Sequence, residues 1–189
     1  MKTRFRLMMA TGLAAVLGLN AASLIAQEQR EIFTGMVANL GAGPTAGTLQ
    51  ITISKWTTQE QRMAFATELA EKGQRALIST FERAEELGFA RFPGTLGWPI
   101  VYAWQVQDGG TRIIRLATHR PVPFIEARAQ TRSRDYPFGI IEMRLGPDGK
   151  GEGDIFSAAS LKFNKDNVLE VESYGIGPQR FLSITTEKK

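Results

Sequence analysis

The sequence contains no cysteine and a single histidine, His119, and these two shortages exclude several kinds of chemistry. Without cysteine there is no disulfide, thiol nucleophile, thiolate metal site or cysteine-linked lipid. One histidine excludes zinc sites that need two or more histidines. No Gly-x-Ser-x-Gly motif surrounds any serine, so a serine-hydrolase triad through His119 has no support. We therefore predict no metal and no cofactor, and we interpret His119 first as a structural residue.

The amino terminus has the layout of a secretory signal rather than of a folded element. MKTRFRLMMATGLAAVLGLNAASLIAQ begins with basic residues, continues with an apolar core and ends with small residues. We predict cleavage after Ala26, or less favourably after Ala22 or Ser23, and export to the periplasm or the exterior. An uncleaved membrane anchor is the alternative, but the apolar core is short for a membrane span.

Without this leader, the chain also carries little net charge. The leader holds three of the 23 Lys and Arg residues and none of the 19 Asp and Glu residues, which leaves 20 basic and 19 acidic residues and a formal charge of +1. No basic run is present, so the sequence predicts no nucleic-acid partner and, after cleavage, no stable membrane anchor. No linker or repeat divides residues 27–189, and their number suffices for one domain with its own core.

What the chain does have is strand pattern. Glu31–Ala38 and Thr48–Lys55 are both typical of strands, and in the second the apolar residues Leu49, Ile51 and Ile53 alternate strictly with polar ones. Such alternation predicts one buried and one solvated face. The Gly- and Pro-rich segment 39–47 between them predicts a turn.

Two consecutive helices are predicted next. Thr57-Thr58-Gln59-Glu60 matches a Thr-x-x-Glu capping box, Gly73 is expected to end the first helix, and Gly88 the second. The expected core-facing residues are Met63, Ala66, Leu69 and Ala70, then Leu77, Phe81, Ala84 and Leu87. This helical hairpin is expected to cover a sheet face or a barrel end, although a lid over a pocket is the alternative.

A β-hairpin is predicted from Trp98 to His119 about the turn Asp108-Gly109-Gly110. If Gly109 and Gly110 form a two-residue loop, three cross-strand pairs share one face: Val106 with Ile113, Trp104 with Arg115, and Tyr102 with Ala117. His119 would follow on that face. A three-residue loop would shift the register and separate these residues.

The remaining strand segments complete the predicted fold. They are Phe138–Leu145, Gly153–Phe163, Val168–Tyr174 and Arg180–Thr185. The glycines within 146–154 predict an exposed hairpin turn rather than a phosphate-binding loop, because no helix follows them. The fold class is therefore α+β, a mostly antiparallel β barrel or sandwich of eight to nine strands with an inserted helical hairpin.

An arginine-rich segment, RPVPFIEARAQTRSRDYPF at 120–138, is the main candidate for a functional site. If it is extended, Glu126, Arg128 and Arg132 share one side, and Asp135 and Tyr136 follow. These groups suit an anionic ligand through charge-assisted hydrogen bonds. The alternative is that they form ion pairs with one another on a solvated loop.

ATHRPVPFIEARAQTRSRDYPFGIIEMRL, the turn GKGEGD and the ending VESYGIGPQRFL resemble a group of exported proteins of environmental, acidobacterial-type bacteria. The resemblance covers most of residues 27–189. It implies export and a shared single-domain fold, and it implies no activity, cofactor or catalytic residue.

Three hypotheses for function follow from these residues. The first is an exported domain that binds a small, anionic or partly apolar ligand in the sheet interior or under the helices. Its expected contacts are Tyr102, Trp104, Arg115 and Arg128, with His119 and Arg132 nearby. The second is a hydrolase or isomerase in which Asp135, if buried, or Glu126 transfers a proton beside Tyr136. The third is an interaction or assembly module marked by a large exposed apolar surface.

Overall fold

The computed structural model describes residues 30–38, 46–120, 135–163, 169–173 and 178–188. The predicted leader and its cleavage sites lie outside these residues, as does most of the predicted turn at 39–47. Most of the arginine-rich segment also lies outside them, including Glu126, Arg128 and Arg132.

Nine strands and two helices make up the described fold. In chain order they are β1 (Glu31–Ala38), β2 (Ala46–Ile53), α1 (Gln59–Lys72), α2 (Gln74–Phe81), β3 (Gly88–Arg91), β4 (Trp98–Asp108), β5 (Thr111–Thr118), β6 (Phe138–Leu145), β7 (Gly151–Phe163), β8 (Leu169–Ser173) and β9 (Gln179–Lys188). The class is α+β, as predicted.

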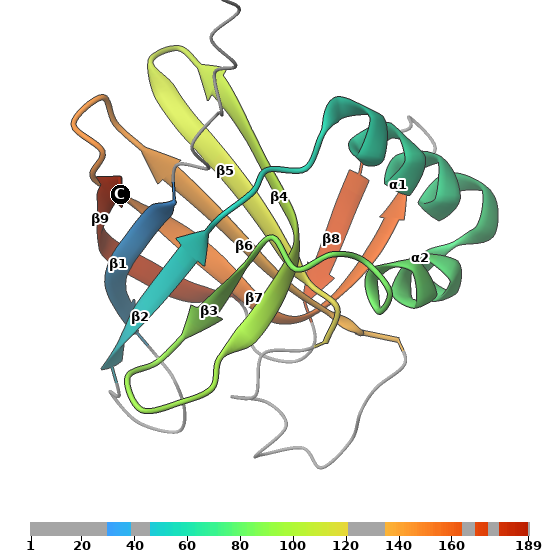
Figure 1. Ribbon diagram of the computed structural model, residues 1–189, viewed down its shortest axis with the longest axis horizontal. Coiled ribbons are helices and arrows are strands. Elements are labelled where there is room, and N and C mark those ends of the chain that lie inside the picture. Colours follow the sequence, from blue (N-terminus) through green and yellow to red (C-terminus); the bar gives the residue numbers. More distant parts are fainter. Residues whose placement is uncertain (1–29, 39–45, 121–134, 164–168, 174–177, 189) are drawn as a thin grey trace, which may run out of the picture.

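The sheet closes on itself into an eight-stranded antiparallel barrel (Figure 1). Its strands follow the order β6-β5-β4-β3-β2-β1-β9-β7, and pairing of β7 with β6 completes the ring. The sequence left barrel and sandwich open, and the structure decides for the barrel. A closed ring leaves no strand edge exposed along its circumference.

The ninth strand, β8, lies outside this ring and pairs with the far end of β7. β9 pairs with Gly151–Ile155 and β8 with Ala159–Phe163, so the two strands occupy successive parts of one edge of β7. At the junction the buried Ser157 hydroxyl donates a hydrogen bond of 2.6 Å to the Gln179 side-chain oxygen. This bond satisfies a buried polar pair where neither strand continues the ladder.

The barrel interior is filled by side chains. Alternation in β1 points Phe33 and Val37 inward, both with no exposed surface, and the other strands contribute in the same way. The buried cluster consists of Phe33, Val37, Leu49, Ile51, Ile53, Leu87, Ala90, Trp98, Ile100, Ala103, Ile114, Leu116, Ile141, Met143, Leu145, Ile155, Phe181 and Ile184. Its close packing leaves the ends and the outer wall of the barrel as the places for a site.

The β4–β5 hairpin has the register that a two-residue loop predicts. Tyr102 pairs with Ala117, Trp104 with Arg115 and Val106 with Ile113. Gly109 and Gly110 both have positive φ, 52° and 88°, the conformation of a type I′ turn. The shared face is confirmed, and it is the outer face of the barrel, because the intervening Ala103, Ile114 and Leu116 belong to the interior cluster.

The first helix begins one residue later than predicted. Thr58 rather than Thr57 is the N-cap, and Gln61 rather than Glu60 completes the capping box. Thr57 is used elsewhere: its N–H donates to the Ala103 carbonyl oxygen and its hydroxyl accepts the Ala103 N–H, at 2.8 and 2.9 Å. Thr57 is therefore fixed to β4, and the next threonine caps the helix.

The predicted core-facing side of α1 is largely wrong. Met63, Ala66 and Ala70 are exposed, whereas Leu69 is buried and Phe65 half-buried. The spacing of four residues places Phe65 and Leu69 on one face, and burial of the large aromatic ring outweighs that of two alanines. Gly73 ends α1, as predicted.

The second helix is shorter than predicted, because it ends at Phe81 and not near Gly88. Gly88 is instead the first residue of β3, opposite Ile53 of β2. A Cβ at this position would lie 2.0 Å from the Thr52 carbonyl oxygen. Glycine is therefore needed here for close strand approach rather than for a helix terminus.

The helices pack beside the barrel wall rather than inside it (Figure 1). Phe81 is central: its ring meets Phe65 of α1 at 5.1 Å and Phe138 of β6 at 5.6 Å, both edge to face. A second buried cluster therefore joins the helices to the wall, with members Leu69, Leu77, Phe81, Val101, Ala117, Phe138 and Leu161. Among the described residues, no helix has the length and apolar character needed to cross a membrane.

We expect Phe81→Ala to lower the free energy of unfolding by about 3–5 kcal/mol, because it empties the centre of the second cluster. Met63→Ala, on the exposed side of α1, is the matched control and should change it by less than about 0.5 kcal/mol. Urea denaturation followed by circular dichroism measures both. Equal effects of the two variants would contradict this packing of α1 and α2.

Candidate functional site

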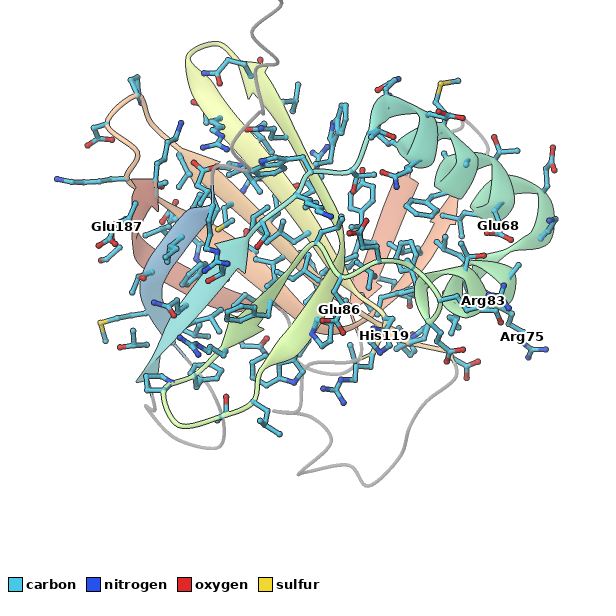
Figure 2. The ribbon with its side chains drawn as sticks, viewed as in Figure 1. Glu68, Arg75, Arg83, Glu86, His119 and Glu187 are labelled. Atoms are coloured by element: carbon cyan, nitrogen blue, oxygen red, sulfur yellow. The ribbon has the colours of Figure 1, made fainter. Side chains whose placement is uncertain are left out.

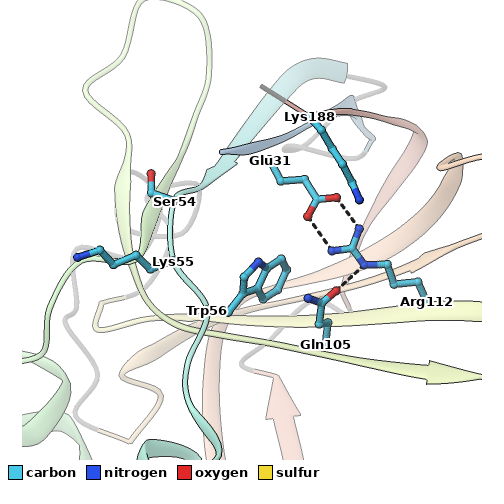
Figure 3. Close-up of a pocket in the computed structure, with 7 residues that line it drawn as sticks. All are labelled: Glu31, Ser54, Lys55, Trp56, Gln105, Arg112 and Lys188. Carbon is cyan, nitrogen blue, oxygen red and sulfur yellow. Dashed lines mark hydrogen bonds and ion pairs between the residues drawn. The ribbon is translucent and has the colours of Figure 1, made fainter. Parts of the chain in front are cut away.

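A pocket of about 670 Å³ opens at one end of the barrel (Figure 3). We call it the mouth pocket. Its lining residues are Glu31, Ser54, Lys55, Trp56, Gln105, Arg112 and Lys188. They come from the start of β1, the segment after β2, the β4–β5 hairpin and the end of β9. The helices contribute none of these residues, so neither α1 nor α2 is a lid over this pocket.

Strand alternation explains why charged side chains reach the mouth. Glu31 occupies the same inward-facing set of β1 as Phe33, and Arg112 the same set of β5 as Ile114. Each residue occupies the inward-facing position nearest to this end of the barrel, where the apolar core stops. The two charges therefore meet at the boundary between the core and the solvent.

Arg112 and Glu31 form a bidentate ion pair at the floor of the mouth pocket (Figure 3). The two terminal nitrogens of Arg112 donate to the two carboxylate oxygens of Glu31 at 2.5 and 2.7 Å. Arg112 Nε donates to Gln105 Oε1 at 2.6 Å. The side chains are 20% and 6% exposed, so the pair is largely withdrawn from water and fixed in direction.

Aromatic rings hold the same guanidinium group. Its carbon lies 5.4 Å from the ring centre of Trp56 and 5.8 Å from that of Phe33. Both distances are within the range of cation–π attraction. Trp56 is half-buried, and it forms a flat apolar wall of the pocket beside a fixed positive group.

A second pocket, of about 470 Å³, lies between the α1–α2 junction and β7 and β8. Asp135 and Tyr136, two of the predicted site residues, both line it. The Tyr136 hydroxyl donates to Glu172 at 3.1 Å. The Gln74 side chain ties this region together, donating to the Asp135 carbonyl oxygen and accepting the Leu161 N–H. Asp135 is exposed, so the burial that would suit it to be a general base is not present.

Three other predicted residues, Tyr102, Trp104 and Arg115, are brought together on the outer wall and line neither pocket described above. Arg62 of α1 stacks on Trp104, with 4.8 Å from its guanidinium carbon to the ring centre. Burial raises the pKa of Tyr102 above its ordinary value, although the positive charges of Arg62 and Arg115 act in the opposite direction. The contacts fit a role in seating the helix.

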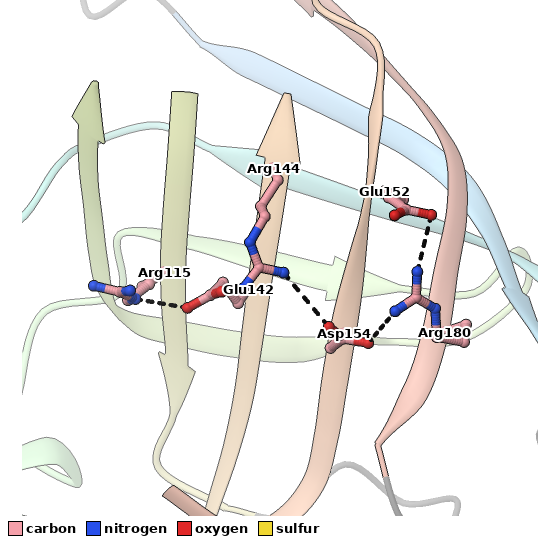
Figure 4. A network of polar contacts seen from close by, with 6 residues as sticks. All are labelled: Arg115, Glu142, Arg144, Glu152, Asp154 and Arg180. Atoms are coloured by element: carbon pink, nitrogen blue, oxygen red, sulfur yellow. Dashed lines mark hydrogen bonds and ion pairs between the residues drawn. The ribbon is translucent and has the colours of Figure 1, made fainter. Parts of the chain in front are cut away.

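A belt of alternating charges continues from Arg115 across the outer faces of β5, β6, β7 and β9 (Figure 4). Arg115 donates to Glu142 at 2.7 Å, and Arg180 contacts Asp154 at 3.0 Å and Glu152 at 2.9 Å. Arg144 also contacts Glu142, and it reaches Asp154 at 3.7 Å. Exposed pairs of this kind contribute about 0–1 kcal/mol each, so the belt supports strand register more than overall stability.

His119 lies just beyond β5, at the opposite end of that strand from Arg112 (Figure 2). It is half-buried, and its buried Nδ1 has no hydrogen-bond partner among the residues that the structure describes. It therefore has no contact with the mouth pocket. In the part of the chain that the structure describes, no three His, Asp or Glu residues are grouped so as to hold a metal ion.

Comparison of the chain with protein-family models, with curated proteins and with solved structures gave no match.

The residues of the mouth pocket were not predicted as a site, although the sequence carried a signal for two of them. Glu31 is a charged residue at an inward position of a strand whose other inward positions are Phe33, Gly35 and Val37. Arg112 stands in the same relation to Ile114 and Leu116. A charge in the apolar phase of a strand indicates a pair or a site. Nothing local indicates that these two meet, since they are 81 residues apart.

We expect Arg112→Met to lower the free energy of unfolding by about 3 kcal/mol, because it leaves the Glu31 carboxylate largely buried without a partner. The double variant with Glu31→Leu should recover most of this loss. Urea denaturation of the single and double variants measures the coupling. Arg115→Met, which breaks the exposed pair with Glu142, is the control and should cost no more than about 1 kcal/mol. Additive effects of the two substitutions at the mouth would contradict the buried pair.

The raised pKa of Tyr102 predicts a loss of stability in alkali. The folded state holds the phenol proton at pH values where the unfolded chain releases it, above pH 10 or so. This contribution is complete below the unfolded pKa and is lost as the pH rises toward the folded pKa. We therefore expect Tyr102→Phe to reduce the fall in the free energy of unfolding as the pH rises above about 10. Parallel slopes for the two proteins would contradict the burial of this phenol.

Proposed function

We propose that the protein is an exported domain that binds a small molecule in the mouth pocket. The observation that supports this proposal is the bidentate Arg112–Glu31 ion pair, which is fixed in place beside the Trp56 ring that lines the pocket. Export remains the proposal of the leader sequence. The predicted ligand site thus moves from the barrel interior, which side chains fill, to the barrel mouth.

Size and composition both support a small-molecule site. Cavities of roughly 300–1,000 Å³ accommodate small ligands, and barrel mouths are common positions for them. The lining combines one aromatic wall with amide, hydroxyl, ammonium and guanidinium groups, which can orient a ligand. Arg112 is held by Glu31, Gln105 and two rings before any ligand arrives, so little ordering of this side chain is needed on binding.

The enzyme hypothesis is less favoured. It relied on Asp135 or Glu126 as a proton-transfer group beside Tyr136. Asp135 is exposed, the Tyr136 hydroxyl donates to Glu172, and Glu126 lies outside the described residues. A binding site needs shape and a few polar groups, whereas catalysis also needs a positioned nucleophile or base.

The assembly hypothesis has little support from the described surface. Its large exposed apolar residues are Met36, Met63, Leu96, Val106 and Val171, which lie on β1, α1, the β3–β4 connection, β4 and β8. Single apolar residues on separate elements are ordinary for a protein surface.

We propose that α1 and α2 act as one helical hairpin that covers the outer wall of the barrel. The buried cluster around Phe81, which includes residues of both helices and of the wall, supports this proposal.

A fragment screen by ligand-observed NMR on the purified protein tests the proposal. We expect fragments that bind to lose at least about tenfold in affinity in Trp56→Ala, since stacking of one aromatic group contributes about 0.5–1.5 kcal/mol beyond its buried area. Trp104→Ala, on the outer wall, is the matched control and should leave their affinity unchanged. Trp56→Phe should keep part of the binding and guards against a folding defect.

The absence of any fragment that depends on Trp56 would overturn the proposal. Fragments that depend on Trp104 instead would move the site to the outer wall.

A further inference from the structure

We infer that the ligand of the mouth pocket is a small monoanion with a flat apolar ring, a class exemplified by an aromatic monocarboxylate. This inference rests on the proposed function and adds the chemical class of the ligand. It follows from the charges of the pocket lining, the directions of its side chains and the aromatic ring of Trp56.

The lining carries one positive charge that the described residues do not neutralise. Arg112 is neutralised by Glu31, and Lys55 pairs with Glu85 at 2.5 Å. Lys188 forms no ion pair with any residue that the structure describes. One uncompensated ammonium group favours a negative group on the ligand over a neutral or cationic one, and it neutralises a single negative charge.

The two lysines differ in direction as well as in pairing (Figure 3). Lys188 extends from β9 toward the Arg112–Glu31 pair, whereas Lys55 extends away from it. A ligand carboxylate beside Lys188 would therefore also lie near the Arg112–Glu31 pair, where the guanidinium group can donate to it. Arginine has five N–H donors, and the contacts to Glu31 and Gln105 account for three of them. The other two N–H groups of Arg112 can donate to the ligand carboxylate, in addition to its contact with Lys188.

The aromatic ring of Trp56 indicates the shape of the apolar part of the ligand. Its ring stacks near Arg112 and forms part of the pocket lining. A planar apolar group could stack on this wall while its acid group lies beside Lys188. Flat rings stack well on tryptophan, and a rigid ring loses little conformational entropy on binding.

Three matched probes separate charge from shape: 2-naphthoate, 2-naphthamide and 2-naphthylmethylammonium. All three present the same ring. Isothermal titration calorimetry at low ionic strength is expected to rank naphthoate first, by about fivefold to tenfold over the amide, the range for one charge-assisted contact at a partly exposed site. Addition of 0.5 M NaCl should reduce the affinity for naphthoate and not that for the amide.

The Lys188→Gln variant tests whether Lys188 supplies the positive charge that attracts the ligand. This variant should bring naphthoate down to the affinity of the amide and leave the amide unchanged. Lys72→Gln, at an exposed lysine of α1 outside the pocket lining, is the control and should change neither probe. Because Lys188 is exposed, neither substitution is expected to disturb folding.

The outcomes distinguish the two proposals. If the three probes bind equally, or if the cation binds best, the inferred class of ligand is overturned while a mouth site for small molecules stands. If naphthoate binds best but Lys188→Gln has no effect, the charge assignment is overturned. If no probe binds and fragments also fail to depend on Trp56, both proposals are overturned.

Discussion

The closed ring of backbone hydrogen bonds is the constraint on which the rest of this structure depends. Once β7 pairs with β6 on one side and with β9 on the other, every strand has a defined inner face. Side-chain alternation then decides what enters the barrel. Apolar residues fill the middle, and the last inward positions, Glu31 and Arg112, come to lie at one end. The mouth pocket thus results from the alternation of side chains along the strands and from closure of the ring.

The division of the molecule into an inner and an outer cluster follows from the same constraint. The inner cluster is complete without the helices, which pack through Phe65 and Phe81 on the outer wall. The residues that we expected to contact a ligand, Tyr102 and Trp104, face this outer side. Their aromatic rings support α1, and Arg62 lies over Trp104. The mouth pocket therefore opens independently of the helical cover.

Local patterns in the sequence predicted eight of the nine described strands, because alternation and turn residues are properties of a few neighbouring positions. β3 was missed, because the second helix was expected to extend to Gly88. Glu31–Ala38 and Phe138–Leu145 have the predicted bounds, and the Gly109–Gly110 turn has the predicted register. Closure into a barrel depends on the pairing of β1 with β9, for which no short segment carries a signal. The helical faces were mispredicted because Met63 and the alanines matched the spacing while Phe65 supplied the larger buried surface.

The place of β9 in the chain has a consequence for how this protein folds. β9 lies between β1 and β7 in the sheet, and it is the last strand in chain order among the described residues. Until residues 179–188 are free to pair, the seam beside β1 stays open and Phe33 and Val37 lack part of their cover. This seam joins two strands that lie far apart along the chain, so the barrel closes only by long-range pairing, and folds that depend on such pairing form slowly.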